Sequence, residues 1–418
     1  MTPDPWRGSA LDTVADGMST VGIVGPLPDL TREKVVAAVS QVLTKDPRSR
    51  LRAVRDRSRP GSWDRDDAPA GQRAERVVSD DISLADFATA TPSLIEALDD
   101  HRPIGIFVDD RHLGIALDHG LIDGGDGVRM LGLISLLACG GTAPIAESPN
   151  HARPIMTATL EFFGRHPRNV RALLQARREQ PSGAIAAASD DRPSEGRPLA
   201  PAFASVVLDA ETSATLRAHG KSHGASWAPI AIELLASSLR SAGVTVAAEA
   251  SIIVDLRRYL PDGVSTQANM CLGQSVPIGP NVDLERTSSA LTAAVAAGRP
   301  LAAAALVGAR SWYRRGPRTL QRTDAAVGPG IAFLGEVSAL FDLPFTGEPQ
   351  LRLVSSPFDR RTVGATCFLL GRRLHLCLNF DAHSVDPDAV ATAVESIRRD
   401  PLALLTDTLR SGASLVRE

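Results

Sequence analysis

The chain has 418 residues, of which 44% are hydrophobic and 22% charged, and its formal net charge is −3. This is the composition of a globular protein, and it excludes a largely disordered, collagen-like or coiled-coil chain. Because phosphate binding needs a basic face, the near-neutral charge gives no reason to expect nucleic acid as a partner. Only three of the 45 basic residues are lysines, so we attribute the many arginines to coding bias rather than to function.

The cysteines and the apolar stretches bear on the cellular location. The four cysteines contain no CxxC pair and are too few for a disulfide framework. The first residues have no apolar run typical of a signal peptide. The most apolar long stretch, residues 291–307, is interrupted by Gly298-Arg299-Pro300 and falls short of the roughly 20 residues of a membrane span. We therefore expect a cytoplasmic chain with no membrane span.

The N-terminal half predicts a strand, a helix and a hairpin. Residues 20–27 have the pattern of a strand, and Asp29 or Thr31 caps a following helix that ends at Asp46-Pro47. Residues 48–80 hold few apolar side chains and predict an exposed strand and loops. Two short β-like runs, 104–108 and 112–117, are joined by a charged turn and indicate a hairpin.

A polar cluster follows that hairpin: Asp118-His119-Gly-Leu-Ile-Asp123-Gly124. An apolar run of helix length, residues 128–139, comes next, so the cluster joins a strand to a helix. Histidine can take up a proton near neutral pH, and an aspartate four residues later is placed to fix the loop. Gly124, Gly125 and Gly127 predict a tight backbone. The alternative is a purely structural role, in which the cluster is a turn with Asp123 as a helix cap and His119 on the surface.

The C-terminal half repeats a mixture of strands and helices. A Gly-, Ser- and Pro-containing segment, residues 179–201, predicts a linker between an N-terminal lobe (1–178) and a C-terminal lobe (202–418). The elements expected in the second lobe are strands 204–208 and 252–256, helices 210–218 and 229–239, a hairpin of 363–370 with 374–380, and a last helix after Asp386. The fold class predicted is mixed α/β (α+β).

For three further residue groups we favour a structural interpretation over a functional one. His219 and His223 have the i, i+4 spacing of metal ligands, but no third ligand is evident, so we expect no metal site. His383 lies in a turn before a helix cap at Asp386. Cys367 and Cys377 fall on the two strands of the predicted hairpin and are expected to be reduced packing residues.

The Asp118–Gly124 cluster resembles the HHxxxDG motif of the CoA-dependent acyltransferase superfamily. That group includes chloramphenicol acetyltransferase, peptide-synthetase condensation domains, wax ester synthases and mycobacterial polyketide-associated acyltransferases. Other segments resemble the family in the same order along the chain. Lys45-Asp46-Pro47 resembles the end of the helix before the family's "HP-x-LR" segment, and Ile253–Arg257 resembles the strand that ends in "VDLR". Gln267–Gly273 resembles the "GN" segment, and Leu378–Asp381 with Asp386-Pro387-Asp388 resembles the final strand and helix.

The resemblance implies two similar lobes, each a mixed sheet backed by helices, with an active-site channel between them. It makes His119 the general base and Asp123 a structural residue, for which Arg257 is the candidate partner. Gly124 completes the motif, and Asn269, Gly335 and His383 are candidates for lining the channel. The sequence departs from the family at two places: Asp118 replaces the first histidine, and Ala332-Phe333-Leu334-Gly335 lacks the polar side chains of an "SNxG" segment that help to stabilise an oxyanion.

These features predict an acyltransferase of specialised metabolism. No serine or cysteine lies in a recognisable nucleophile motif, so we expect direct transfer from a thioester to a hydroxyl or amine of a small molecule. The donor would be acyl-CoA or an acyl carrier protein, with no permanently bound cofactor and no metal. One alternative keeps the fold but changes the reaction to cyclisation, elimination or hydrolysis, and another is a non-catalytic binding module.

Overall fold

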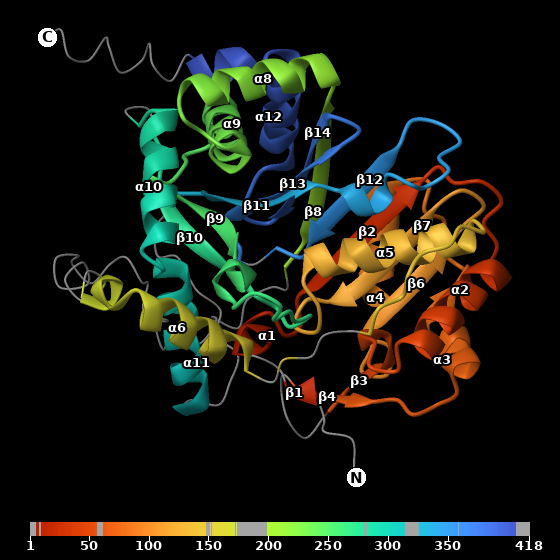
Figure 1. The fold of residues 1–418 in the computed structure, drawn as a ribbon. Coiled ribbons are helices and arrows are strands. Elements are labelled where there is room, and N and C mark those ends of the chain that lie inside the picture. Colours follow the sequence, from red (N-terminus) through yellow and green to blue (C-terminus); the bar gives the residue numbers. More distant parts are fainter. Residues whose placement is uncertain are drawn as a thin grey trace, which may run out of the picture.

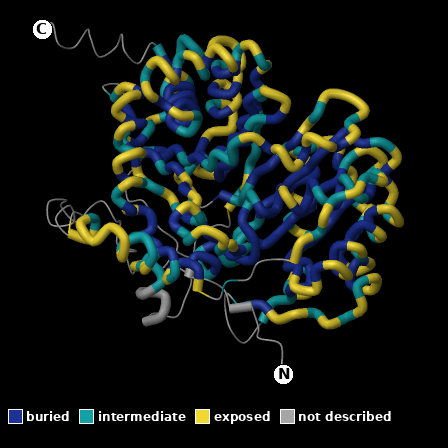
Figure 2. The backbone as a smooth tube through the Cα atoms, viewed as in Figure 1, coloured by how far each residue is buried: buried dark blue, intermediate teal, exposed yellow. Residues whose placement is uncertain are grey.

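The protein is described from a computed structural model, in which the helices and strands form two lobes (Figure 1). The residues that the structure describes are 6–7, 10–56, 62–147, 151, 153–171, 173, 199–279, 282–313, 326–357 and 359–406. Each lobe is built on its own β-sheet with helices packed against it, and the buried residues follow the two sheets (Figure 2). The predicted mixed α/β class is therefore confirmed.

The first lobe contains a five-stranded sheet in the order β12-β2-β7-β6-β5. Its strands are β2 (Ser19–Gly25), β5 (Val78–Ser79), β6 (Ile104–Val108), β7 (Leu113–Asp118) and β12 (Gln350–Ser355). The predicted hairpin is present, with Ile104 opposite Leu117 and Val108 opposite Leu113. The edge strand β12 comes from the C-terminal half of the chain and runs antiparallel to β2. This sheet thus combines residues from both sides of the predicted linker 179–201, and the domain division itself stays a prediction.

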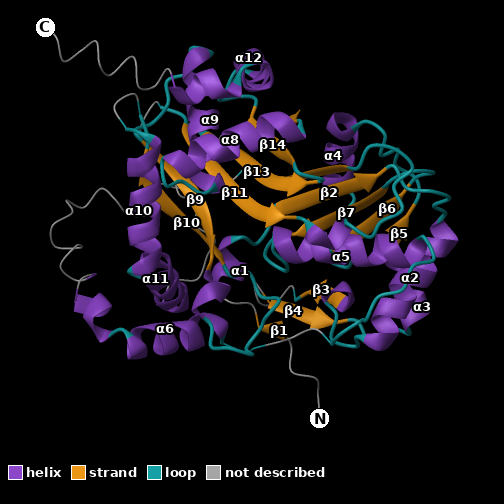
Figure 3. Cartoon of the chain, turned by 45° about the horizontal axis from the view of Figure 1, so that its top comes forward, coloured by secondary structure: helices purple, strands orange, loops and turns teal. Residues whose placement is uncertain are grey.

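Helices cover both faces of this sheet. They are α2 (Arg32–Lys45), α3 (Ala70–Val77), α4 (Phe87–Glu96) and α5 (Gly124–Ala138). Thr31 caps α2, because its hydroxyl accepts a hydrogen bond from the backbone N–H of Lys34. Figure 3 shows α4 and α5 on opposite sides of the sheet. The apolar stripe of α2 joins the buried core with Val35, Val39 and Leu43, as the 3.6-residue periodicity predicts.

The second lobe contains a six-stranded mixed sheet in the order β10-β9-β11-β13-β14-β8. Its strands are β8 (Pro201–Leu208), β9 (Glu249–Asp255), β10 (Cys271–Pro277), β11 (Gly328–Glu336), β13 (Thr362–Leu370) and β14 (Arg373–Asp381). Strand β11 runs parallel to both of its neighbours, β9 and β13, and the other described pairs of this sheet are antiparallel. Successive side chains of β14 face opposite cores: Leu376 packs in the core of the second lobe and Cys377 in that of the first.

The remaining elements surround these sheets. Helix α6 (Pro154–Arg165) precedes the predicted linker. The helices described after the linker are α8 (Ala210–Ser222), α9 (Trp227–Ser241), α10 (Leu284–Ala296), α11 (Arg299–Tyr313) and α12 (Pro387–Arg399). A small sheet joins β1 (Trp6–Arg7), β4 (Ser62–Arg65) and β3 (Ala53–Arg55), near the short helix α1 (Ala10–Val14). Three 3₁₀ turns are η1 (Arg50–Arg52), η2 (Leu256–Tyr259) and η3 (Ser338–Leu340).

The prediction of exposed strands and loops over residues 48–80 was wrong. The segment contains α3, and three of its arginines are buried: Arg50, Arg52 and Arg73. Arg73 donates through Nε to the carbonyl of Leu51 (2.8 Å) and through Nη2 to that of Ala53 (2.8 Å). A guanidinium offers five donors, so it can be buried where backbone carbonyls need partners. Charge alone therefore misjudged the exposure of this segment.

Two predicted helix ends also need correction. The helix expected from residue 128 begins at Gly124, because the Asp123 carboxylate caps its first turn. The helix expected to stop before Gly220 continues to Ser222. A Cβ on Gly220 would lie 2.2 Å from the side chain of Ile230, so this glycine serves close packing of α8 on α9. The predicted linker lies outside the described residues except at 199–201.

No helix of the described ranges is by itself long and apolar enough to cross a membrane. Residues Leu284–Ala296 and Arg299–Gly308 reach that threshold only together, and the pair is bent by 56°.

The exchanged strand β12 can be tested through its core contacts. Leu353 of β12 is 2% exposed within the core of the first lobe, whereas Leu160 of α6 is 67% exposed. Replacing a buried leucine by alanine costs about 2–5 kcal/mol. Leu353→Ala should therefore lower the free energy of unfolding, measured in urea, by about that amount, and Leu160→Ala should change it by less than about 0.5 kcal/mol. Equal small effects of both substitutions would contradict the placement of β12.

Candidate functional site

His119 lies where the two lobes meet, in the loop between β7 and α5. Its backbone N–H donates to the carbonyl of Met18 (2.7 Å), and its carbonyl accepts from the side-chain amide of Asn269 in the second lobe (3.4 Å). The residue is partly exposed, and Nδ1 is buried. Within the described part of the chain, the imidazole makes no hydrogen bond. The backbone of His119 is therefore fixed from both lobes, while its ring has no hydrogen-bond partner among the described residues.

Asp123 links this loop to the second lobe. One carboxylate oxygen accepts from the N–H of Asp126 (3.0 Å) and so caps α5, and the other accepts from Nη2 of Arg257 (2.6 Å). Burial raises the pKa of this carboxyl, but the Arg257 guanidinium, the N–H of Asp126 and the charge of a protonated His119 lower it to below its usual value. Asp123 is therefore held as a carboxylate, and the pairing with Arg257 expected from the resemblance is present.

Arg257 begins the turn that follows β9 and binds several acceptors at once. Nη2 also reaches Asp126 (2.8 Å) and the carbonyl of Ala268 (3.0 Å), and Nε donates to the carbonyl of Thr266 (3.0 Å). Burial lowers the pKa of the guanidinium, but the surrounding carboxylates raise it well above its ordinary value. The side chain is therefore a permanent positive charge that joins the second lobe to the start of α5.

Two residues of this cluster, Asp126 and Arg50, were missed in the sequence. Burial and the charge of Asp123 raise the pKa of Asp126, which also pairs with Arg129. Arg50 is buried and donates to the carbonyl of Leu121. Burial lowers the pKa of its guanidinium below the ordinary value, and the charges of Asp12, Asp126 and Asp123 offset part of that lowering. Arg50 follows Asp46-Pro47 at the "HP-x-LR" position, so the resemblance contained the signal that identifies it.

Asn269 is held by Asp12, a second residue that the sequence did not single out. Asp12, in α1, is 1% exposed, and its carboxylate accepts from the backbone N–H of Asn269 (2.8 Å). The side-chain oxygen of Asn269 accepts from the N–H of Cys271 (3.1 Å). Asn269 is thus brought to the His119 loop, with its side chain bonded to backbone groups on both sides.

Asp118, at the position of the family's first histidine, points into a different network. Its carboxylate pairs with Arg55 and accepts from the N–H of Gly120 (2.8 Å). Arg55 also pairs with Asp16 (2.5 Å) and lies over the ring of Trp63, 4.8 Å from its centroid. Asp118 therefore ties the motif loop to the segment before β2 and to the small sheet.

The glycines of the motif differ in what they require. A Cβ on Gly127 would lie 2.8 Å from Leu117, and one on Gly120 would lie 2.7 Å from the carbonyl of Asp12, so both allow close approach. A Cβ on Gly124 would meet nothing within 4 Å. The prediction of a tight backbone was therefore wrong for Gly124, whose missing side chain instead leaves open space at the start of α5.

The other candidates for lining the channel lie apart from this cluster. Gly335 ends β11 at a bulge, with φ of 77°, and His383 is exposed in the turn after β14. No hydrogen bond or ion pair between described residues joins either to His119. Phe333 stacks on Trp227, with ring centroids 6.4 Å apart, so its ring packs within the second lobe. The channel itself, and the lining roles of Asn269, Gly335 and His383, stay predictions.

The cysteines that the structure describes offer no alternative nucleophile. Cys367 and Cys377 are buried and reduced, and burial raises the pKa of both thiols. Burial and nearby carboxylates likewise raise the pKa of Cys271, whose Sγ is 4.0 Å from Asp123. In the described ranges no three His, Cys, Asp or Glu side chains are grouped to hold a metal ion. The arginine-rich segment 314–322 lies outside the described residues.

The Asp118 network makes a prediction about pH. Burial raises the pKa of Asp118, Arg55 lowers it, and the result is about 6, against about 3.9 in an unfolded chain. Between these values the folded protein holds a proton that the unfolded chain has lost, so Asp118 makes stability fall as pH rises. The free energy of unfolding in urea should be measured for wild type and Asp118→Asn from pH 4 to pH 7. Relative to the variant, wild type should lose stability as the pH rises to about 6, and the difference should stay constant above that pH. A relative gain over that range would mean that Arg55 outweighs burial.

Comparisons with known proteins agree with this architecture. No protein-family model matches the chain, and no curated protein matches it by sequence. Among solved structures, it is similar to polyketide synthase associated protein 5 from Mycobacterium tuberculosis, with a TM-score of 0.59, 16% identity, and coverage of 97% of this chain and 98% of that one. It is also similar to trichothecene 15-O-acetyltransferase from Fusarium sporotrichioides (TM-score 0.63, 11% identity, coverage 96% and 95%).

A third similar structure is the first condensation domain of the CDA synthetase, with a TM-score of 0.59, 15% identity, and coverage of 98% of this chain and 97% of that domain. All three matches span nearly the whole of both chains, so the likeness covers both lobes and not one sheet. The chain therefore has the two-lobed fold of the CoA-dependent acyltransferases and condensation domains.

Proposed function

We propose that the protein is an acyltransferase that moves an acyl group from a thioester to a hydroxyl or amine, with His119 as the general base. The observation that supports this most is the state of His119. Its backbone is held by Met18 and Asn269 from the two lobes, and its imidazole makes no hydrogen bond to a described residue. A ring positioned in this way can accept a proton from a bound substrate.

The proposed step uses one base for both halves of the reaction. His119 takes the proton of the acceptor hydroxyl or amine as that oxygen or nitrogen attacks the thioester carbonyl. The carbon–sulfur bond then breaks, and the imidazolium returns the proton to the leaving thiolate. The carboxylate of Asp123, close enough for a protonated His119 to lower its pKa, stabilises the positive charge formed on the ring.

A direct transfer, without an acyl-enzyme, fits the chemistry of the cysteines. The thiolate is the nucleophilic form of cysteine, and the pKa of each of the four thiols is raised. The donor would be acyl-CoA or an acyl carrier protein, and the acceptor a small molecule of specialised metabolism. Open space at Gly124, at the start of α5, leaves room beside the motif.

A changed reaction in the same fold is the second candidate. Ala332 and Phe333 stand where the family has polar side chains, and Phe333 packs against Trp227. Loss of side-chain donors weakens stabilisation of an oxyanion, which favours cyclisation, elimination or hydrolysis over transfer. A non-catalytic binding module is the third candidate.

One assay separates these candidates. The protein is incubated with a panel of acyl-CoA donors, with and without alcohol and amine acceptors, and free thiol is measured. Thiol release that depends on the acceptor is expected for transfer. Release that does not depend on it would indicate hydrolysis, and no release with any donor or acceptor would contradict transfer from acyl-CoA.

The role of His119 is tested in the same assay. His119→Ala should lower turnover by about 10²–10⁴-fold, the usual contribution of a positioned general base. The control is His101→Ala, because His101 is exposed and lies outside the motif and the candidate channel residues. Both variants should keep the wild-type melting temperature. Near wild-type turnover of His119→Ala, or an acyl adduct on the intact protein after donor alone, would rule out this mechanism.

A further inference from the structure

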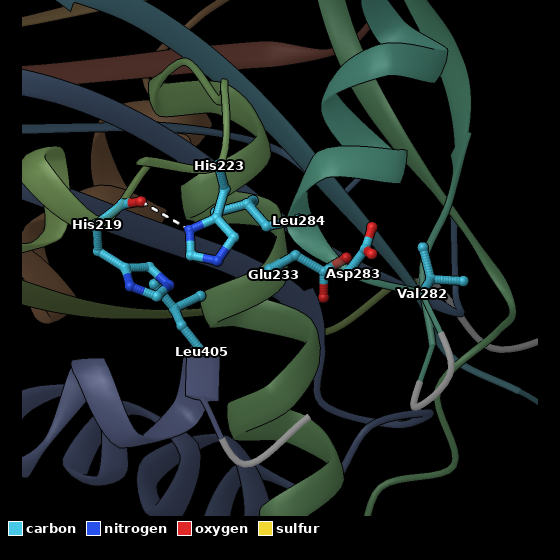
Figure 4. A pocket seen from close by; sticks show the side chains of 7 residues that line it. All are labelled: His219, His223, Glu233, Val282, Asp283, Leu284 and Leu405. Atoms are coloured by element: carbon cyan, nitrogen blue, oxygen red, sulfur yellow. Dashed lines mark hydrogen bonds between the residues drawn. The ribbon is translucent and has the colours of Figure 1, made fainter. Parts of the chain in front are cut away.

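A small cavity lies in the second lobe, between the end of α8, the middle of α9 and the start of α10 (Figure 4). Its polar walls are His219, His223, Glu233 and Asp283, and its apolar walls include Leu284 and Leu405. About 20 Å³ is open to the centre of a water-sized sphere, and roughly 10–15 Å³ of such space holds one water molecule. The cavity therefore takes a group of about that size.

Glu233 supplies the strongest sign that the cavity binds something. The residue is 4% exposed within the apolar helix α9. Oε1 lies 3.0 Å from the hydroxyl of Thr287, whose one hydrogen it shares with the carbonyl of Pro277, whereas Oε2 is buried and has no hydrogen-bond partner among the described residues. A buried acceptor without a partner is costly, so this oxygen calls for a donor.

His223 presents a second acceptor. Its Nδ1 lies 2.9 Å from the carbonyl of His219, which can only accept, so Nδ1 carries the hydrogen of the neutral ring. In the neutral ring Nε2 is then an acceptor, and no hydrogen bond between described residues occupies it. The carboxylate of Asp283 borders the same cavity, and one of its oxygens caps α10 through the N–H of Arg286 (2.7 Å), which leaves the other available.

Three acceptors around a space of this size match an –NH₃⁺ group, which has three donors and a positive charge. The apolar side chains of Leu284 and Leu405 suit a short alkyl stem. The side chains are not arranged as metal ligands, since no described group of three His, Cys, Asp or Glu residues could hold a metal ion. We propose that this cavity binds the ammonium group of a small primary amine through Glu233, Asp283 and His223.

This site is separate from the His119 cluster. Strand β10 runs between them: Cys271 at its start contacts Asp123, and Pro277 at its end accepts from the hydroxyl of Thr287. Six residue steps of an antiparallel strand span about 20 Å. The inference does not rest on the proposed acyl transfer, and its test needs no turnover.

The charges around the cavity set the pH at which it binds. Burial raises the pKa of Glu233 to about 7, Thr287 and Arg240 lower it, and Asp283 raises it. Burial and the neighbouring His223 lower the pKa of His219, which is therefore neutral at pH 7. No ion pair between described residues joins Arg240 to Glu233. Since a primary amine stays protonated up to about pH 10, binding should be stronger at pH 8 than at pH 6.

The test is the thermal stability of the protein with methylammonium chloride, compared with sodium and tetramethylammonium chlorides at equal ionic strength. A ligand that binds the folded state raises the melting temperature with its concentration. At pH 8 methylammonium should do so and the other two cations should not, and the effect should shrink at pH 6. No methylammonium-dependent rise at pH 8, or a rise with Zn²⁺ or Mn²⁺ in its place, would overturn the proposal.

Variants assign the effect to the cavity. Glu233→Gln keeps the size of the side chain and removes its charge, so the methylammonium-dependent rise should be lost. Glu249→Gln is the control, because Glu249 is exposed and binds the hydroxyl of Ser275. Asp283→Asn keeps a side chain able to cap α10, and it should weaken the rise even if Glu233→Gln fails to fold. A rise as large as in wild type in Glu233→Gln or in Asp283→Asn would contradict the site.

Discussion

The contact between Arg257 and the start of α5 is the constraint on which the site depends. Arg257 lies in the turn η2, directly after β9 of the second lobe, and Asp123 caps α5 of the first lobe. Their ion pair, with 2.6 Å between Nη2 of Arg257 and Oδ2 of Asp123, fixes the end of the loop that carries His119, because His119 lies four residues before Asp123. Asp126 and the carbonyl of Ala268 bind the same Nη2 atom, so the guanidinium cannot turn away without leaving three acceptors unpaired.

The buried charges around this contact explain its cost and its specificity. Asp12, Arg50, Asp123 and Asp126 are all buried, and each loses hydration on folding. A buried ion pair is weak evidence for stability, but breaking one member leaves an uncompensated charge. The arrangement is therefore better understood as a device that fixes one orientation of the lobes. Asp12 extends this arrangement: its carboxylate accepts from the backbone N–H of Asn269, and the side-chain amide of Asn269 donates to the carbonyl of His119.

Local patterns predicted the elements that depend on neighbouring residues. The hairpin of β6 and β7 and the helix of Val35, Val39 and Leu43 follow from periodicity and turn residues within a few positions. Strand β12 was not predicted, because its partner β2 lies more than 300 residues away and no local signal names it. The burial of Arg73 was missed for a similar reason: its acceptors, Leu51 and Ala53, are remote backbone carbonyls.

The site was predictable to the extent that the motif names its residues. His119, Asp123 and Arg257 came from the motif and the resemblance, whereas Asp126 and Asp12 entered only when the lobes were assembled. Asp118 shows the limit most clearly, since the resemblance named it only as a departure from the family's first histidine, and its pairing with Arg55 was not predicted. Arg55 lies 63 residues before Asp118 in the sequence, so no local pattern identifies this pair.

The most direct measurement of the central claim is a double-mutant cycle on Asp123 and Arg257. Asp123→Asn and Arg257→Gln should each lower the free energy of unfolding by about 3–5 kcal/mol, because each leaves a buried charge without its partner. The double variant should lose less than the sum of the two, by about 0.5–3 kcal/mol, since it removes both charges. Losses that add to within about 0.3–0.5 kcal/mol would show that the two residues do not act as a pair, and would contradict the account of how the His119 loop is held.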